Sequence, residues 1–194
     1  MIEIKPAGDC GEGTRRRISE VFVDGYGQHL AFFSKDHHKL AQALEHMFVL
    51  DVFYVALVDG AIAGIAACTD GKIKSITSDS RELIKHLGFF KGILASIVFK
   101  QVLEKPHILT GDRIAWVELV ATAAKYRGRG VASAIMSYLF TLPQYDEYVL
   151  EVADTNTNAV RLYQKIGFQE FKRAKHRHSR LSGVNYLIYM KYQK

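Results

Sequence analysis

The sequence has few of the features that mark secreted, metal-binding or membrane proteins. Its two cysteines, Cys10 and Cys68, lie far apart and form no CxxC pair, which excludes a disulfide framework and a zinc-finger site. No apolar run approaches the roughly 20 residues that a membrane-spanning helix needs, and the first residues lack the layout of a signal peptide. We therefore expect a cytoplasmic protein that holds no metal and has no membrane partner.

The length and composition favour one folded unit. The chain has 194 residues, of which 48% are hydrophobic, enough to bury a core and too many apolar residues for a disordered chain. We expect a single domain over residues 1–194. The net charge of +6 suits a small polyanionic ligand and does not require nucleic acid.

The most informative segment is a glycine-rich turn that reads RGRGVA at residues 127–132. It follows a strand-like run at 116–122 and opens a helix-like run at 131–140. Unpaired N–H groups and the helix dipole favour an anion at such a helix start, and glycine lets a phosphate approach the backbone. The spacing is neither a P-loop nor a dinucleotide fingerprint. The turn predicts a phosphate site; the alternative is a tight connection with solvated arginines.

A second pattern follows at residues 156–168. Ala159, Leu162, Tyr163 and Ile166 have the spacing of one helix face, and Gly167 is placed to end that helix. The run at 148–152 just before it reads as a buried strand.

Together the two segments resemble the GNAT superfamily of acyl-CoA-dependent N-acetyltransferases. The family signature R/Q-x-x-G-x-G/A matches at Arg127, Gly130 and Ala132. The downstream family pattern matches at Asn156, Ala159, Leu162, Tyr163, Lys165, Gly167 and Phe168. The resemblance, carried mainly by residues 116–171, implies an α/β fold with a mixed, mostly antiparallel central sheet that is splayed at its middle and has helices on both faces.

The resemblance also implies a binding mode for acetyl-CoA. The backbone at residues 128–133 would hold the pyrophosphate, the strand at 120–122 would pair with the pantetheine arm, and Asn156 would meet that arm. The implied cofactor-binding residues are Val120, Ala121, Thr122, Arg127, Gly128, Arg129, Gly130, Val131, Ala132, Ser133 and Asn156.

Tyr163 matches the position of the family's usual general acid. A phenol is a sensible proton donor to a departing thiolate. The alternative is a core aromatic on an apolar helix face.

Two glutamates are candidates for the general base. Glu118 and Glu151 each lie inside an apolar strand-like run, where a carboxylate is unexpected without a polar cleft. Strand alternation puts Glu118 on the face of Trp116, Val120 and Thr122. A structural ion pair, an exposed carboxylate or a water-relayed base are the alternatives.

Two further segments fall outside the motifs. Residues 78–105 form a long apolar helical stretch with a break near Gly88, which reads as extra helices that pack on the sheet or on a second copy in a homodimer, or as a lid over an acceptor. Residues 172–180 form a basic loop without an acid, either solvated or turned toward the 3′-phosphate of CoA or an acidic acceptor.

The resulting expectation is an N-acetyltransferase that moves an acetyl or other short acyl group from acetyl-CoA to a primary amine of a small molecule, peptide or protein, by direct attack in a ternary complex. The main rival is a non-catalytic acyl-CoA-binding or sensing module. A nucleic-acid binder based on residues 172–180 is a second rival, although that run has little aromatic support for base stacking.

Overall fold

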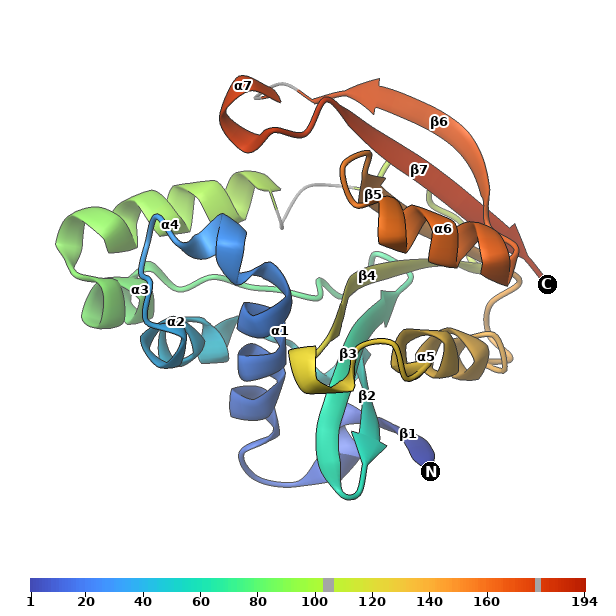
Figure 1. Cartoon of the computed structure of the whole chain (residues 1–194), viewed down its shortest axis with the longest axis horizontal. Coiled ribbons are helices and arrows are strands. Elements are labelled where there is room, and N and C mark those ends of the chain that lie inside the picture. The colour runs from blue at the N-terminus through green and yellow to red at the C-terminus, as the bar shows by residue number, and fades with distance from the viewer. Residues whose placement is uncertain (103–106, 177–178) are drawn as a thin grey trace.

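The computed structural model describes residues 1–102, 107–176 and 179–194. In these residues seven strands form one sheet in the order β1-β2-β3-β4-β5-β7-β6 (Figure 1). All neighbouring strands are antiparallel except β4 and β5, which confirms the predicted mixed sheet. The strands are β1 (Ile2–Pro6), β2 (Phe53–Val58), β3 (Ala61–Thr69), β4 (Ile114–Thr122), β5 (Glu147–Ala153), β6 (Gln169–Lys175) and β7 (Tyr186–Gln193). The α-helices are α1 (Thr14–Leu30), α2 (His37–Leu44), α3 (Ser80–Leu87), α4 (Phe89–Val102), α5 (Val131–Leu139), α6 (Thr157–Ile166) and α7 (Ser179–Ser182).

Helices cover both faces of the sheet, as predicted. Side chains from α1 to α4 form one core with alternate residues of β2 and β3, among them Val55, Ile65 and Ala67. Side chains from α5 and α6 form the other core with the residues between them in the strands, such as Ala66. Because β3 lies inside the sheet with a core on each face, its sequence is apolar at nearly every position.

Local sequence signals set the element boundaries. Asp59 and Gly60 both have positive φ, 51° and 75°, which is the two-residue hairpin turn that an Asp-Gly pair favours. Asp36 caps α2 by accepting the Lys39 N–H, as expected for a polar residue just before a helix. Gly167 ends α6 in the left-handed region at φ 111°, as predicted.

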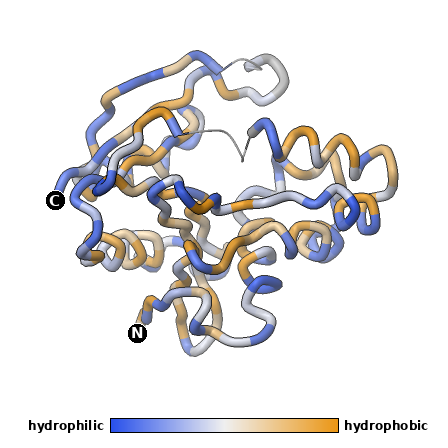
Figure 2. Tube along the Cα trace, turned by 180° about the vertical axis from the view of Figure 1, so that it is seen from behind, coloured by the Kyte–Doolittle hydropathy of each residue, from blue (hydrophilic) through white to orange (hydrophobic). Residues whose placement is uncertain are grey.

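The apolar stretch after β3 forms two helices, with the break at Gly88 as predicted. Gly92 lets α4 pack closely on α3, since a Cβ there would lie 2.5 Å from the Ile84 Cα. The outward side of α4 is also apolar, with Phe90 86% and Ile97 47% exposed, and α4 is largely orange in Figure 2. None of the helices in the described part of the chain is long and apolar enough to cross a membrane. Residues 103–105 of the predicted stretch lie outside the described residues.

The predicted basic loop at 172–180 is partly a strand. Lys172, Arg173 and Lys175 belong to β6, which pairs with β7. Arg173 forms an ion pair with Glu170 at 2.8 Å, so its charge is already matched. Residues 177 and 178 of the predicted loop lie outside the described residues.

Candidate active site

The sheet opens at its centre, between β4 and β5. These parallel strands pair only where Ile114–Trp116 meets Glu147–Val149. Beyond that pairing β4 runs on to Thr122 and β5 to Ala153, and in the described residues neither finds a partner strand on the facing edge. We call this opening, at the carboxyl ends of both strands, the wedge. Ligands of open α/β sheets bind outside the carboxyl ends of strands.

A β-bulge shapes the β4 side of the wedge. Leu119 has a φ of 54°, and the register with β3 shifts between the pairs Ala67–Glu118 and Ile65–Ala121. The bulge breaks the strict alternation expected from the sequence. Val120 therefore packs in the core of α5 and α6, whereas Leu119 packs in the core of α1 to α4.

This corrects the predicted surroundings of Glu118. Its carboxylate does lie on the face of Trp116, because His107 contacts both residues. The prediction that Val120 shares that face was wrong, because the extra residue of the bulge turns Val120 to the opposite core.

The glycine-rich turn begins α5 beside the wedge. Gly128 and Gly130 have φ values of 74° and 78°, and a Cβ at either position would meet no protein atom within 4 Å. No side chain caps α5. Throughout residues 1–102, 107–176 and 179–194, the N–H groups of 128–133 make no hydrogen bond. The turn thus offers a row of N–H donors without acceptors at the positive end of a helix dipole.

Gly64 on β3 fixes the position of this helix start. A Cβ on Gly64 would lie 2.5 Å from the Val131 Cγ1 and 3.3 Å from the Ile135 Cδ1. The first turn of α5 therefore rests directly on the sheet, and Val131 and Ile135 are buried there. This packing holds the N–H groups of 128–133 in place.

The basic side chains near the turn differ in what they contact. Arg127 donates to the Thr122 carbonyl at 3.2 Å and to the Asp24 carbonyl at 2.9 Å, so its guanidinium ties the turn to β4 and α1. Lys125 and Arg129 lie near the ring of Tyr126, at 4.8 and 5.7 Å from its centroid. Arg129 is exposed, and its positive charge remains close to the row of N–H groups.

Tyr163, the predicted acid, is buried on α6 and packs in the core of α5 and α6. Burial, with a smaller effect from the phenol of Tyr26, raises its pKa, so the phenol keeps its proton at neutral pH. Tyr26 comes from α1 on the other face of the sheet and donates to the Val120 carbonyl at 3.3 Å. The two phenols thus interact from opposite layers near the opened part of β4.

Glu118 lies at the closed end of the wedge and is held on both oxygens. The His107 Nε2 is 2.7 Å from its Oε1, and the Ser75 hydroxyl donates to its Oε2 at 2.5 Å. His107 stacks on the indole of Trp116, with ring centroids 4.5 Å apart and an interplanar angle of 9°.

Glu151 faces Glu118 across the wedge. Each glutamate lies just past the last paired residues, Trp116 and Val149, and those two residues share a small core with Tyr189. The Tyr189 hydroxyl donates to Glu151, and burial followed by this hydrogen bond raises the pKa of Tyr189. Both predicted base candidates therefore lie on one face of the wedge.

Asn156, at the end of the connection from β5, caps α6. Its side-chain oxygen accepts the Ala159 N–H at 3.3 Å, and the residue is exposed. The asparagine thus positions the helix that carries Tyr163.

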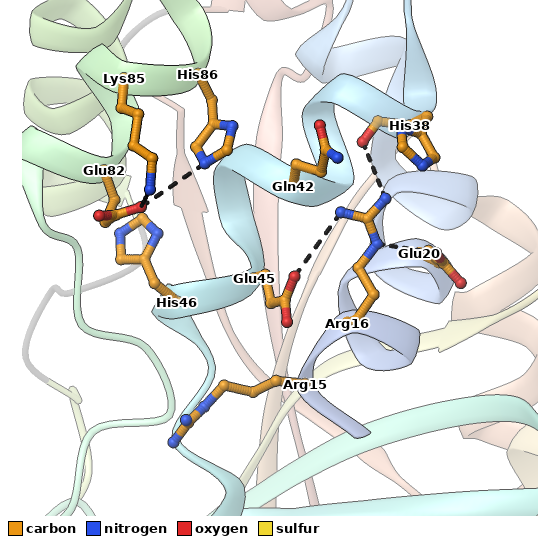
Figure 3. A pocket seen from close by; sticks show the side chains of 10 residues that line it. All are labelled: Arg15, Arg16, Glu20, His38, Gln42, Glu45, His46, Glu82, Lys85 and His86. Carbon is orange, nitrogen blue, oxygen red and sulfur yellow. Dashed lines mark hydrogen bonds and ion pairs between the residues drawn. The ribbon is translucent and has the colours of Figure 1, made fainter. Parts of the chain in front are cut away.

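A roomy cleft of about 660 Å³ lies elsewhere, between α1, α2 and α3 (Figure 3). Its charged side chains neutralise one another. Arg16 pairs with Glu20 at 3.0 Å and with Glu45 at 3.8 Å, and Glu82 pairs with Lys85 and His86. Within the described residues no cluster of His, Cys, Asp and Glu could hold a metal ion, here or at the wedge.

Comparison with known proteins decides the family. A model of the acetyltransferase (GNAT) family matches residues 22–168. The chain belongs to the GNAT acetyltransferase family. As a GNAT protein it is an acyltransferase, and the matched region holds β4, β5, the turn and the candidate residues Glu118, Glu151 and Tyr163.

Solved structures share the GNAT fold across the whole chain. PH1933 from Pyrococcus horikoshii OT3 is 16% identical with a TM-score of 0.60, and the match covers 100% of this chain and 99% of that one. The ribosomal-protein-S18-alanine N-acetyltransferase from Escherichia coli is 13% identical, with a TM-score of 0.59 over 100% and 94%. An N-acetyltransferase from Staphylococcus aureus Mu50 is 19% identical, with a TM-score of 0.58 over 99% and 100%. No curated protein matches the chain.

Sequence reasoning missed several residues near the site, among them Tyr26, Ser75 and His107. Tyr26 lies on α1 and His107 and Ser75 lie in connecting segments, far in sequence from the GNAT motifs. No local pattern marks them, because only the fold brings them to β4. The strongest available signal was a polar residue inside an apolar surrounding, which Glu118 gave and its partners did not.

Proposed function

We propose that this GNAT protein transfers an acetyl group from acetyl-CoA to a primary amine, as one domain over residues 1–194. The amine attacks the thioester directly while both substrates are bound. The acceptor is a small molecule or a peptide amine.

The observation that carries the proposal is the row of N–H groups at 128–133 beside the wedge, which have no acceptor in the described residues. A diphosphate offers several acceptor oxygens and negative charge, which match these donors and the dipole of α5. The open space over Gly128 and Gly130 leaves room for phosphate against the backbone. Arg129 adds a nearby positive charge.

The pantetheine arm fits the exposed edge of β4. An extended amide-bearing chain can add to a strand edge by main-chain hydrogen bonds, and residues 120–122 offer such an edge inside the wedge. Asn156 lies at the exit of the wedge, where the arm would leave toward the turn. This orientation places the thioester between Glu118, Glu151 and Tyr163.

The reaction then needs one base and one acid. The base takes a proton from the amine, the amine nitrogen forms a bond to the thioester carbon, and the C–S bond breaks as the intermediate collapses. Tyr163, whose raised pKa keeps it protonated, donates to the departing thiolate. No covalent bond to the protein forms.

Glu118 is the better candidate for the base. Glu118 has one hydrogen-bond donor on each oxygen, and these two donors hold its carboxylate in one plane. Tyr189 donates to Glu151. Each Glu118 oxygen still has a lone pair to accept a proton. Glu151 remains the alternative base, across the wedge.

A two-step experiment tests the proposal. Acetyl-CoA should raise the melting temperature, and free thiol should appear when spermidine, glucosamine, a lysine peptide or a peptide with a free N-terminus is added. Stabilisation by acetyl-CoA without thiol release on a broad panel of amines would favour the rival sensing module. Absence of any stabilisation would contradict the proposed cofactor.

A further inference from the structure

The geometry points to a supporting pair behind the base: we propose that His107 and Ser75 are positioning residues that fix the orientation of the Glu118 carboxylate at the closed end of the wedge. The inference rests on the proposed function, in which Glu118 accepts the proton of the amine.

The two donors reach different oxygens of Glu118. His107 Nε2 lies 2.7 Å from Oε1 and Ser75 Oγ lies 2.5 Å from Oε2. An ionised carboxylate only accepts hydrogen bonds, so His107 donates from Nε2. One donor on each oxygen fixes the plane of the carboxylate and leaves a lone pair on each oxygen for a substrate proton. This arrangement orients a base without consuming it.

Both donors are themselves held in place. The His107 ring lies flat on the Trp116 indole, and the indole N–H donates to the Leu109 carbonyl at 2.6 Å. Ser75 is 4% exposed, and its carbonyl accepts the Val49 N–H at 3.1 Å. Fixed donors lose little entropy when they bind the carboxylate, so they stabilise its charge efficiently.

Two neighbouring titratable groups are placed differently from His107. Cys68 on β3 packs in the core of α5 and α6, and burial together with the Glu118 charge raises the pKa of the thiol to about 12, so it stays neutral. Glu151, across the wedge on β5, offers acceptor oxygens rather than donors. The orientation of Glu118 therefore depends on His107 and Ser75.

The test follows the Glu118 carboxylate directly. In protein labelled with ¹³C at glutamate carboxylates, the Glu118 signal is assigned by its absence in Glu118→Gln. We expect this signal to shift in His107→Ala and in Ser75→Ala, because each variant removes the donor to one carboxylate oxygen. His107→Gln should restore it, because the glutamine amide nitrogen can reach the place of Nε2. His86→Gln, in the cleft between α1, α2 and α3, is the matched control and should not move it.

The second measurement is steady-state turnover, with whichever amine of the panel releases thiol. The kcat at saturating substrates should fall in both variants and recover in His107→Gln, while the KM for acetyl-CoA stays unchanged. An unmoved NMR signal in both His107→Ala and Ser75→Ala overturns the inference. If His107→Ala does not fold, Ser75→Ala, which removes one hydroxyl, decides alone. Wild-type turnover in Glu118→Gln would instead overturn Glu118 as the base, whatever the NMR signal does.

Discussion

The turn at 127–132 and the cleft between α1, α2 and α3 are both rich in charge, yet they differ in what is already satisfied. In the cleft each acid is paired with a base, as Arg16 is with Glu20 and Glu45. At the turn the N–H groups of 128–133 have no acceptor in any described part of the chain. The cleft of Figure 3 has a volume of about 660 Å³, but the turn retains the free binding capacity. Hydrogen-bond donors without acceptors locate a ligand site better than the volume of a cleft or its number of charged residues does.

The largest expected difference between the turn and the cleft is their response to an added negative charge. Ser133→Asp should weaken acetyl-CoA binding at least a hundredfold, because like charges brought together cost several kcal/mol. The melting temperature should stay level or rise, since an acid in the first turn of a helix complements its dipole. Titration calorimetry with acetyl-CoA and a thermal melt give the two values.

Gln42→Glu is the matched control for Ser133→Asp, because Gln42 lines the cleft. It should leave the affinity within twofold of wild type. Equal losses in both variants would mean that the effect comes from overall charge rather than from the turn.

Tyr163→Phe separates chemistry at the wedge from binding at the turn. Loss of the phenol should lower kcat by about ten- to a hundredfold, within the range of general acid catalysis, with the Kd for acetyl-CoA unchanged. Tyr138→Phe on α5 is the control, and Tyr26→Phe tests whether the neighbouring phenol shares the role. Full activity of Tyr163→Phe with a good acceptor would remove Tyr163 as the acid.

A smaller effect is expected from alanine substitutions at the starts of α1 and α5, which have the same backbone geometry. Gly13 and Gly130 both precede a helix in the left-handed region, at φ 76° and 78°, without a side-chain cap. Alanine at either position should cost about 1 kcal/mol of stability through backbone strain. Only Gly130→Ala should also weaken acetyl-CoA binding, about tenfold, because its Cβ enters the space assigned to phosphate. A similar loss of binding in Gly13→Ala would point to a general loss of stability.

The smallest predicted effect is a pH dependence of stability that comes from His46 in the cleft. Burial lowers the pKa of His46 from its usual value of 6.5, and its Nε2 accepts the N–H of Asp79, the N-cap residue of α3. The unfolded chain then binds a proton more readily, so stability should fall as the pH drops below about 6.5, by about 1–2 °C in melting temperature. His46→Gln should flatten this dependence while turnover at pH 7.5 stays the same.

The sequence predicted the parts of the site that obey local rules. Gly128, Gly130 and Gly167 each needed a backbone conformation that few other residues adopt, so the sequence alone indicated their positions. The mixed, mostly antiparallel sheet with its splayed centre followed from the GNAT resemblance. The face of Val120 was predicted wrongly, because a bulge at Leu119 depends on the match between β3 and β4 rather than on β4 alone. His107 and Ser75 could not be found, since their contact with Glu118 spans 11 and 43 positions.

The most direct test of the central claim is a crystal structure with acetyl-CoA bound. Diphosphate oxygens should lie within hydrogen-bond distance of the N–H groups of 128–133, with the thioester in the wedge between Glu118 and Tyr163. Acetyl-CoA seated in the cleft of Figure 3, or a turn left empty while the cofactor binds elsewhere, would contradict it.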